Sequence, residues 1–390
     1  MSKSPINNQI SNITNRELSV AIVHDWLYGG GAEKVVLELH KLYPDAPIYT
    51  SYCSDEWRQI LNGRVVTGYL QNWPFNKLRK FLPALRQRWF RRLDLSSFDV
   101  VISSSGNGEA KFVLPKKQAG GPIHISYCHT PTHFYWRHYD QYLENPGFRP
   151  RWLIRLGLRL LVRPLKKQDY IAAQKIDYFI ANSTHIQRDI KKFYGRDSVV
   201  IFPPVNTARF EKYTSPKYRN NQQAKRHGFV TLGRQVPLKK IDLIVKACTE
   251  LKAPLTVIGN GPEHGRLVDL AGPTVNFQTA MSDQDLPEAL ASAQAFIFAS
   301  HEDFGIAPVE AMAAGTPVIA YKAGGALDYV KPGVTGMFFG EQDVKSIKKA
   351  IRTFDQKRYD ARKIGLSTSL FDTKTFRKNI TEFVEKTINN

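Results

Sequence analysis

Residues 295–315 read AFIFASHEDFGIAPVEAMAAG, and this stretch decides the fold class. Its first six residues are almost wholly apolar, which suits a strand that is buried in a parallel sheet. Pro308 is expected to open a helix, and Gly315 is expected to end it about two turns later. A buried strand followed at once by a helix is the repeating unit of wound α/β proteins.

Two glutamates flank this strand-to-helix turn. Glu302 lies just beyond the expected strand, and Glu310 is expected in the first turn of the helix. Open α/β sheets bind ligands at the carboxyl ends of their strands, and the free N–H groups from Phe304 to Val309 would form a positive cradle for a phosphate. The two carboxylates could then bind hydroxyls at the two ends of the ligand. Alternatively, Glu310 only offsets the helix dipole and Glu302 is solvated.

Short apolar runs alternate with helical segments through most of the 390 residues. Strands are expected in the first half at residues 20–23, 100–103, 124–127, 178–181 and 199–202, and in the second half at residues 229–232, 255–258, 295–298 and 317–320. A chain of this length is too long for one ordinary core, so the repeated pattern predicts two domains. The expected fold class is α/β, with two Rossmann-like wound domains that face a central cleft.

The boundary between the two domains is expected just after Pro203-Pro204. Residues 213–226 are rich in Asn, Gln and Lys, which indicates a linker with a surface loop. We therefore expect an N-terminal domain at residues 1–205, a second domain at residues 206–370 and a C-terminal helical segment at residues 371–390.

The cysteines and the first residues bear on the compartment. Cys53, Cys128 and Cys248 are odd in number and widely spaced, so they form neither a disulfide framework nor a zinc motif, which indicates a reducing compartment. Residues 1–16 are polar, and no window reaches the roughly 18 consecutive apolar residues of a spanning helix. A cytoplasmic protein is expected.

The net charge of +20 is concentrated in two segments, residues 73–92 and 149–167, each with seven basic residues and no acidic one. In the second segment an arginine recurs every four residues, at positions 151, 155, 159 and 163, and apolar residues with Trp152 fill the gaps. This spacing predicts a helix with a basic stripe beside a broad apolar face. Such a helix is typical of proteins that lie on an anionic membrane surface.

Two other interpretations of the basic helix remain open. Its apolar residues could face the protein core and leave a solvated basic edge. Nucleic-acid binding is not expected, because the aromatic residues stand among leucines and no recognition motif accompanies them.

Polar turns follow several of the expected strands. Gly29-Gly30-Gly31 follows the first and could approach a ligand closely, although its spacing differs from the dinucleotide fingerprint G-x-G-x-x-G and an ordinary turn is the alternative. Arg234 and Lys239 follow the strand at 229–232 and could together hold a pyrophosphate, unless they are only surface charges. With the third turn, Gly259-Asn260-Gly261, and the loop of Glu302, they predict a nucleotide site.

His129 is the candidate from the first half, because it follows the strand at 124–127 and would face the cleft. A structural histidine is the alternative reading. A metal site is not expected, because the histidines lack ligand spacing. Asp283 and Asp285 have the spacing of a D-x-D motif, but Ser282 with Asp285 is expected to cap a helix.

At this point the chain resembles family 4 retaining glycosyltransferases of the GT-B fold. The motifs that carry the resemblance span most of the chain and are Gly30 to Lys34, the loop from Gly233 to Lys239, residues 255–262, Glu302 with Glu310, and Gly324-Gly325 before Asp328. Residues 23–26 and 127–131 look more narrowly like bacterial mannosyltransferases that build O-antigen and exopolysaccharide from GDP-mannose.

The resemblance implies roles for the candidate residues. Glu310 would bind the ribose, and Arg234 with Lys239 would neutralise the departing pyrophosphate without a metal. The donor sugar would be held by Glu302 together with the N–H groups of Phe304, Gly305, Ile306 and Ala307. His129 would contact the sugar from the first half, Gly30 and Gly31 would approach the phosphates or the acceptor, Gly261 would line the donor pocket, and Met281 would lie at the base.

The resemblance also implies an activity and a setting. We expect transfer of mannose from GDP-mannose, with retention, to a lipid-linked saccharide at the inner face of the plasma membrane, and a C-terminal helix that returns to the first domain. Three alternatives remain: a UDP-sugar-dependent member of the same family, a non-hydrolysing sugar-nucleotide epimerase, and a non-enzymatic basic adaptor.

Overall fold

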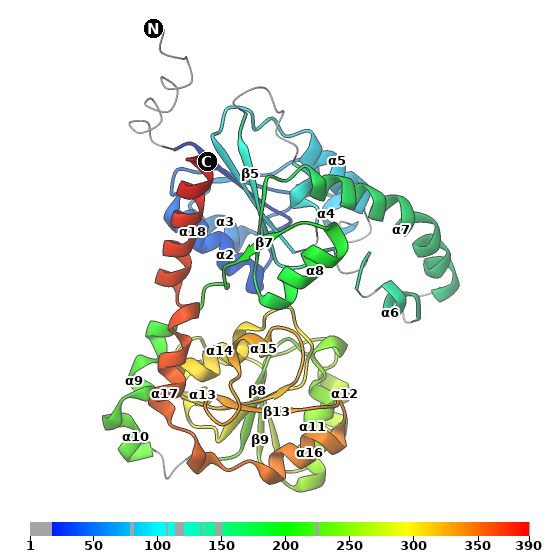
Figure 1. Ribbon diagram of the computed structural model, residues 1–390. Helices are drawn as coiled ribbons and strands as arrows, with labels where there is room; N and C mark the ends of the chain where they lie inside the picture. Colours follow the sequence, from blue (N-terminus) through cyan, green and yellow to red (C-terminus); the bar gives the residue numbers. More distant parts are fainter. Residues whose placement is uncertain are drawn as a thin grey trace. The chain divides into compact units, whose positions relative to one another are not determined.

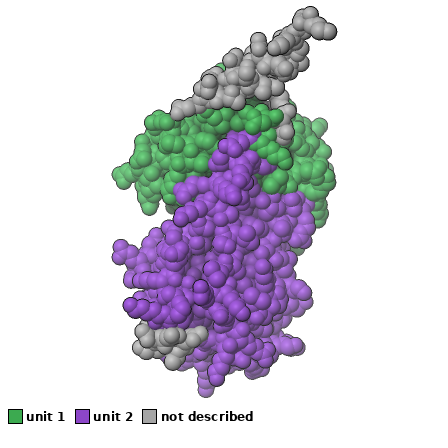
Figure 2. Space-filling model, turned by 60° about the vertical axis from the view of Figure 1, so that its left-hand side comes forward, with its two compact units in different colours: residues 1–180, 189–199, 386–390 green, residues 181–188, 200–385 purple. Residues whose placement is uncertain are grey.

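The computed structural model describes residues 18–78, 82–106, 108–113, 121–132, 135–137, 139–144, 150–222 and 226–389. The chain divides into two compact units (Figure 2): unit 1 comprises residues 1–180, 189–199 and 386–390, and unit 2 comprises residues 181–188 and 200–385. The main crossing between them, at Val200, lies a few residues before the expected boundary at residues 205 and 206. The last five residues belong to unit 1.

The sheet of unit 1 has the strand order β3-β2-β1-β4-β5-β6-β7 within the described residues. Its strands are β1 (Val20–His24), β2 (Ile48–Thr50), β3 (Val65–Val66), β4 (Val100–Ser105), β5 (Ile123–Cys128), β6 (Tyr178–Ala181) and β7 (Ser198–Val200). Strands β1 and β4 are buried along their whole length, which explains why β1 before His24 and the first half of β4 are apolar without alternation; β4 ends in the buried serines 103–105.

Helices fill the connections of this sheet. They are α2 (Gly31–Leu42), α3 (Asp55–Ile60), α4 (Phe75–Leu78), α5 (Pro83–Arg91), α6 (Tyr139–Glu144), α7 (Arg151–Gln174) and α8 (Thr184–Tyr194), with short 3-10 turns that include η3 (Ala110–Phe112). The basic amphipathic segment predicted from the sequence forms α7, which extends well beyond the sheet (Figure 1). Arg79, Lys80 and Arg149 of the two basic segments lie outside the described residues.

The sheet of unit 2 is parallel throughout, with the order β10-β9-β8-β11-β12-β13. Its strands are β8 (Phe229–Leu232), β9 (Leu255–Ile258), β10 (Val275–Gln278), β11 (Ala295–Phe298), β12 (Val318–Tyr321) and β13 (Gly336–Phe339). Its helices are α9 (Glu211–Thr214), α10 (Pro216–Gln222), α11 (Ile241–Leu251), α12 (His264–Leu270), α13 (Leu286–Ala291), α14 (Ile306–Ala313), α15 (Ala326–Tyr329), α16 (Val344–Thr353), α17 (Ala361–Leu366) and α18 (Thr373–Ile388).

Strand β11 shows why this sheet is buried on both faces. Phe296 and Phe298 pack in one hydrophobic cluster, together with α13 and α14, whereas Ala295 and Ile297 pack in a second cluster, together with α11 and α16. Successive side chains of a strand point to opposite faces, so the uninterrupted apolar run supplies both cores. This arrangement, with the parallel order, confirms the predicted wound α/β class.

Both sheets reverse their chain order between two central strands. The reversal lies between β1 and β4 in unit 1, and between β8 and β11 in unit 2. Loops that leave such a pair diverge to opposite faces and open a crevice at the carboxyl ends of the strands, which is where ligands bind in these folds.

The prediction of a linker at residues 213–226 is wrong. Within the described part of this segment, residues 213–214 belong to α9 and residues 216–222 form α10, both of unit 2, and Tyr213, Arg219 and Arg226 are buried. The segment folds because its arginines donate hydrogen bonds to the carbonyls of Ala291, Ala314 and Gly315, at the ends of α13 and α14.

Candidate active site

Helix α14 begins earlier than the sequence predicted. It starts at Ile306 rather than at Pro308, so Glu310 falls in the second turn and the prediction of the first turn is wrong. Gly305 precedes the helix with a φ of +88°, a left-handed conformation that glycine adopts without strain. Pro308 is tolerated at the third helical position because the first four N–H groups of a helix have no intrahelical partner.

The end of α14 is as predicted. The helix ends at Ala313, and Gly315 follows with a φ of +76° and donates its N–H to the carbonyl of Met312. Glu310 is buried, with 6% of its surface exposed, among the otherwise apolar residues of this helix.

The turns after β8 and β11 meet at the switch point of unit 2. Lys239 ends the 3-10 turn η6 (Pro237–Lys239), and its Nζ lies 2.6 Å from Oε1 of Glu302. The same carboxylate oxygen accepts a hydrogen bond of 2.7 Å from the hydroxyl of Ser300. Both charged side chains remain partly exposed, so the pair can exchange partners with an incoming anion. The structure thus brings together two predicted site residues.

The turn after β9, which contains Gly259-Asn260-Gly261, packs against the turn after β8. Gln235 is buried, and its backbone carbonyl accepts the N–H of Glu263. Its backbone N–H donates to the carbonyl of Asn260 at 2.9 Å, and its side-chain amide donates to the carbonyl of Gly259 at 2.6 Å. A Cβ on Gly261 would overlap the backbone of Gln235, so only glycine allows this approach. Sequence reasoning missed Gln235, whose only signal is its place beside Arg234.

The remaining predicted donor residues of unit 2 differ in exposure. Arg234 is exposed at the turn after β8. Met281 is partly buried and packs on the core that contains α13 and α14. Ser282 and Asp285 bond to each other in the turn before α13: the Ser282 hydroxyl accepts the Asp285 N–H at 3.1 Å and donates to the Asp285 carboxylate at 2.6 Å, but Asp285 is the residue before α13 and its side chain does not cap the helix.

The glycine turn of unit 1 is held by a glutamate. Gly30 is the residue before α2, Gly31 is its first residue, and both are exposed. The carboxylate of Glu33 folds back and accepts the N–H of Gly29 at 3.1 Å. A carboxylate from the first turn of α2 thus satisfies a backbone N–H of the glycine loop, as the acidic residue of a capping box does.

His129 is buried in a cluster at the carboxyl ends of β1, β4 and β5. Its Nε2 lies 2.8 Å from the Ser104 hydroxyl, and Nδ1 of His24 lies 2.8 Å from the Ser104 carbonyl oxygen. Burial, together with the neighbouring His24, lowers the pKa of His129 to about 3. The ring is therefore neutral at physiological pH and can act through hydrogen bonds. Sequence reasoning missed His24, although it ends the first strand.

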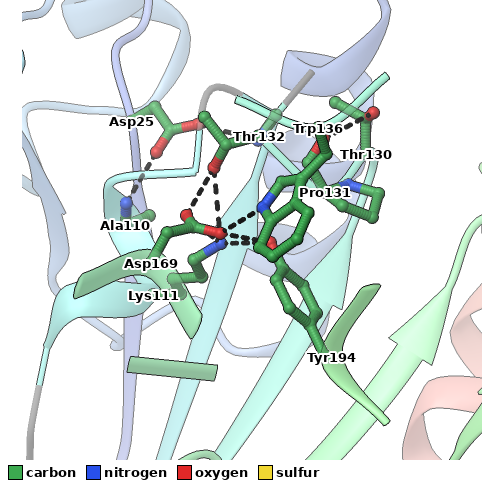
Figure 3. A network of polar contacts seen from close by, with 10 residues as sticks. Asp25, Ala110, Lys111, Thr130, Pro131, Thr132, Trp136, Asp169 and Tyr194 are labelled. Carbon is green, nitrogen blue, oxygen red and sulfur yellow. Dashed lines mark hydrogen bonds and ion pairs between the residues drawn. The ribbon is translucent and has the colours of Figure 1, made fainter. Parts of the chain in front are cut away.

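Asp25 joins the two central strand ends of unit 1. Its carboxylate accepts the N–H of Gly106 at 2.7 Å and the N–H of Ala110 at 2.6 Å (Figure 3). Asp25 follows β1 and Gly106 follows β4, so this acid fixes the loops at the switch point of unit 1. Asp25 lies within the motif at residues 23–26, but its spacing indicated no role for it.

A second buried acid ties α7 to the same region. Asp169 of α7 forms an ion pair with Lys111 at 2.6 Å and accepts hydrogen bonds from Thr132, Trp136 and Tyr194 at 2.6 to 2.8 Å (Figure 3). Burying a charge is costly unless it is paired and hydrogen-bonded, and this carboxylate is both. The network anchors the C-terminal half of α7 to the loop that follows His129.

The predicted residues fall in both units: His129, Gly30 and Gly31 belong to unit 1 and the others to unit 2. Among the described residues, no group of three or more His, Cys, Asp or Glu side chains could hold a metal ion. In that same part of the chain, no helix is both long enough and apolar enough to cross a membrane.

Two family models match the chain and together cover most of it. "Glycosyltransferase Family 4" matches residues 29–209, and "Glycosyl transferases group 1" matches residues 215–365. The chain is 38% identical over 111 residues to the GDP-mannose-dependent alpha-mannosyltransferase of Mycobacterium tuberculosis, a match that covers 28% of this chain and 29% of that protein. Over its whole length, it is 23% identical to the alpha-1,3/1,6-mannosyltransferase ALG2 of Dictyostelium discoideum, covering 95% and 99% of the two chains.

The chain spans about half of the length, or less, of the first bacterial relatives that it matches. Among solved structures, it is similar to Anabaena Alr3699/HepE in complex with UDP, with a TM-score of 0.66, 19% identity, and 95% of this chain and 100% of that chain covered. This similarity extends through both wound units. The chain is a glycosyltransferase of family 4 with the GT-B fold.

Proposed function

We propose that the protein transfers mannose from GDP-mannose, with retention of configuration, to a lipid-linked saccharide at an anionic membrane surface. The named activities of relatives support the donor, because the Mycobacterium tuberculosis protein is a GDP-mannose-dependent mannosyltransferase and the Dictyostelium protein is a mannosyltransferase. The lipid-linked acceptor is an inference from the resemblance to enzymes of surface polysaccharide synthesis.

The pairing of Lys239 with Glu302 beside the start of α14 is the observation that carries the donor site. It places a cation, a carboxylate and a helix N-terminus at one switch point. The cation and the helix N-terminus favour a diphosphate, whereas the carboxylate favours sugar hydroxyls. On donor binding, Lys239 exchanges Glu302 for the diphosphate and leaves the carboxylate to the sugar.

The other residues complete this assignment. Arg234 joins Lys239 on the departing diphosphate, so cations and backbone dipoles supply the charge stabilisation and no metal is required. Glu310 binds the ribose, and Gly261 allows the nucleotide to approach the backbone. Met281 contacts the nucleobase. From unit 1, neutral His129 hydrogen-bonds the sugar, while Gly30 and Gly31 approach the phosphates or the acceptor.

A titration with nucleotides tests the donor site. Glu310→Ala should weaken GDP binding by roughly tenfold or more, because the ribose hydroxyls lose a charged acceptor. Glu341→Ala is the matched control, since Glu341 is exposed in the same unit and should leave the affinity unchanged. Unchanged GDP affinity in Glu310→Ala would remove this residue from the pocket. If the wild-type protein binds UDP more tightly than GDP, the donor is a UDP-sugar.

Helix α7 supports the membrane setting. Trp152 and Leu160 are 67% and 66% exposed, and Leu153 and Leu156 are also exposed, so the alternative in which this apolar face packs on the core is disfavoured. The two basic segments adjoin, because Arg91 of α5 donates to Gln168 of α7 at 2.9 Å. Exposed apolar residues beside cations suit the boundary between lipid headgroups and acyl chains.

A further inference from the structure

The loop that carries Glu302 is held by three donors from two other segments. The carbonyls of Glu302, Asp303 and Phe304 each accept a hydrogen bond: from the N–H of Gly325 at 2.9 Å, from the hydroxyl of Ser183 at 2.6 Å and from the hydroxyl of Tyr329 at 3.1 Å. Three successive peptide units of this loop are therefore fixed through their oxygen atoms.

This clamp also fixes the N–H groups of the loop. In a planar trans peptide the carbonyl of one residue and the N–H of the next point in opposite directions. Ser183 therefore sets the direction of the Phe304 N–H, and Tyr329 sets that of the Gly305 N–H. Neither peptide can flip without losing its hydrogen bond. Glycine permits such flips most readily, so the peptide before Gly305 has the greatest need of restraint.

Ser183 is itself firmly positioned. Ser183 is fully buried, and its hydroxyl oxygen accepts the N–H of Ile186, in the first turn of α8, at 3.1 Å. The same oxygen lies 2.6 Å from the carbonyl oxygen of Asp303 and 3.1 Å from the side-chain oxygen of Asn182. The next residue, Thr184, donates its N–H to Asp328 at 3.0 Å and its hydroxyl to the same carboxylate. All of these residues belong to unit 2.

The close approach of Gly324 and Gly325 completes the clamp. A Cβ on Gly324 would overlap the carbonyl of Glu302, and a Cβ on Gly325 would overlap the backbone of Phe304. Tyr329, whose side chain is buried, lies in α15, a few residues after these glycines. The clamp is thus built from two segments, residues 182–186 and 324–329, that flank the loop of Glu302.

We propose that Ser183 and Tyr329 are positioning residues for diphosphate recognition: they hold the Phe304 and Gly305 N–H groups in the orientation that binds the phosphate distal to the nucleoside. This inference rests on the proposed function, which assigns those N–H groups to the donor. No side chain caps α14 within the described residues, so its first N–H groups extend the same cradle. The role of Ser183 requires only its hydroxyl, which distinguishes it from a residue that binds the ligand directly.

Comparing GDP with GMP separates positioning from a general loss of structure. In Ser183→Ala and in Tyr329→Phe, we expect GDP affinity to fall roughly tenfold while GMP affinity changes little, because only the distal phosphate uses the cradle. Ser183→Thr keeps the hydroxyl and should restore most of the GDP affinity. Thermal unfolding of each variant, with and without GDP, shows whether the protein is folded under the assay conditions.

The outcomes are distinguishable. If the wild-type protein binds neither GDP nor UDP, the proposed function fails. If the wild type binds and the folded variants retain the wild-type ratio of GDP to GMP affinity, the positioning role is overturned while the donor site stands. An equal loss of GDP and GMP affinity also overturns it, since that result indicates only a damaged fold. Should Ser183→Ala fail to fold, Tyr329→Phe and Ser183→Thr still decide.

Discussion

At the scale of a single residue, the ion pair between Lys239 and Glu302 leads to a prediction for the rate of sugar transfer. In the proposed mechanism, Lys239 leaves Glu302 and stabilises the diphosphate as the glycosidic bond breaks. We expect Lys239→Ala to lower kcat/KM by roughly 100-fold to 1,000-fold, the usual effect of removing one group that stabilises transition-state charge. Initial rates of sugar transfer measure this effect.

Stability should respond much less to the same change. The two side chains are partly exposed, and such ion pairs contribute about 1 kcal/mol or less. Lys240→Ala is the matched control, because Lys240 is the adjacent cation and is not assigned to the diphosphate. Equal transfer rates in the wild type and in Lys239→Ala would remove Lys239 from the donor site.

The buried His129 predicts a dependence of stability on pH. Burial and His24 lower its pKa to about 3, so between about pH 6.5 and pH 3 the unfolded chain binds a proton that the folded chain does not. His129 therefore makes the folded state less stable as the pH falls through this range, by about 1.4 kcal/mol per pH unit where the difference is complete.

The test of His129 is a comparison of slopes. Burial raises the pKa of Glu109 to about 7, so Glu109 has the opposite effect: its folded form retains a proton that the unfolded form loses, and stability falls as the pH rises from about 4.5 to 7. Glu109 is present in both the wild type and His129→Gln, so its effect cancels when the two are compared. Because His129→Gln lacks the buried imidazole, urea unfolding at several pH values should show a smaller acid-induced loss of stability in this variant than in the wild type. Identical slopes would contradict the assignment.

The sequence predicted that Glu302 and Lys239 lie close together, because each follows an apolar strand whose carboxyl end had to lie at the edge of a parallel sheet, and the structure confirms this proximity. The sequence did not identify Asp25, Gln235 or Ser183. These residues act through backbone groups that are distant in sequence, and their partners depend on which strands are neighbours. Strand order is set by packing over the whole sheet, and no spacing within one segment encodes it.

At the scale of elements, buried arginines hold two helix ends. Arg219 donates to the carbonyls of Ala291 and Ala314, where α13 and α14 end, so it satisfies acceptors that a helix leaves unpaired. Arg219→Met should lower the free energy of unfolding by about 2–4 kcal/mol, because buried carbonyls lose charged donors.

Urea unfolding measures the effect of Arg219→Met. The exposed neighbour Lys217 offers a matched control in the same helix, and Lys217→Met should change stability by less than about 0.5 kcal/mol. A shift in Arg219→Met no larger than in the control would show that these helix ends do not depend on the guanidinium. Arg226, which donates to Gly315, provides an independent second position.

The strands that were predicted with their correct bounds are mostly buried. Strands β8, β9 and β11 have the bounds expected from their apolar runs. Strands β2, β3, β10 and β13 were not predicted, because they lie at or next to the sheet edges, where partly exposed residues interrupt the apolar pattern. Helices α9 and α10 were taken for a linker because tertiary hydrogen bonds, rather than an apolar face, hold Arg219 in place.

At the scale of the whole molecule, the same winding occurs twice and supplies each unit with a switch point. In unit 1, Asp25 joins the loops after the two central strands, and in unit 2 Lys239 and Glu302 do so. The pair in unit 2 is partly exposed, whereas Asp25 is buried and accepts a backbone N–H on each of its carboxylate oxygens. The switch point of unit 2 thus has charged side chains that a ligand can reach, whereas Asp25 at the switch point of unit 1 fixes the loops around His129.

The proposed membrane association concerns the whole molecule, because α7 extends from unit 1 while Asp169 anchors its C-terminal half. Arg155 is occupied in bonds of 2.8 Å to the carbonyls of Leu143 and Glu144, so Arg159 and Arg163 are the better cations to change. Replacing both by Ala should lower partitioning onto anionic vesicles by roughly 30-fold, at about 1 kcal/mol per cation. Flotation of the full chain measures this, with Arg362→Ala/Lys363→Ala, exposed on α17, as the charge-matched control. Binding that ignores both salt and the α7 changes would contradict the membrane surface.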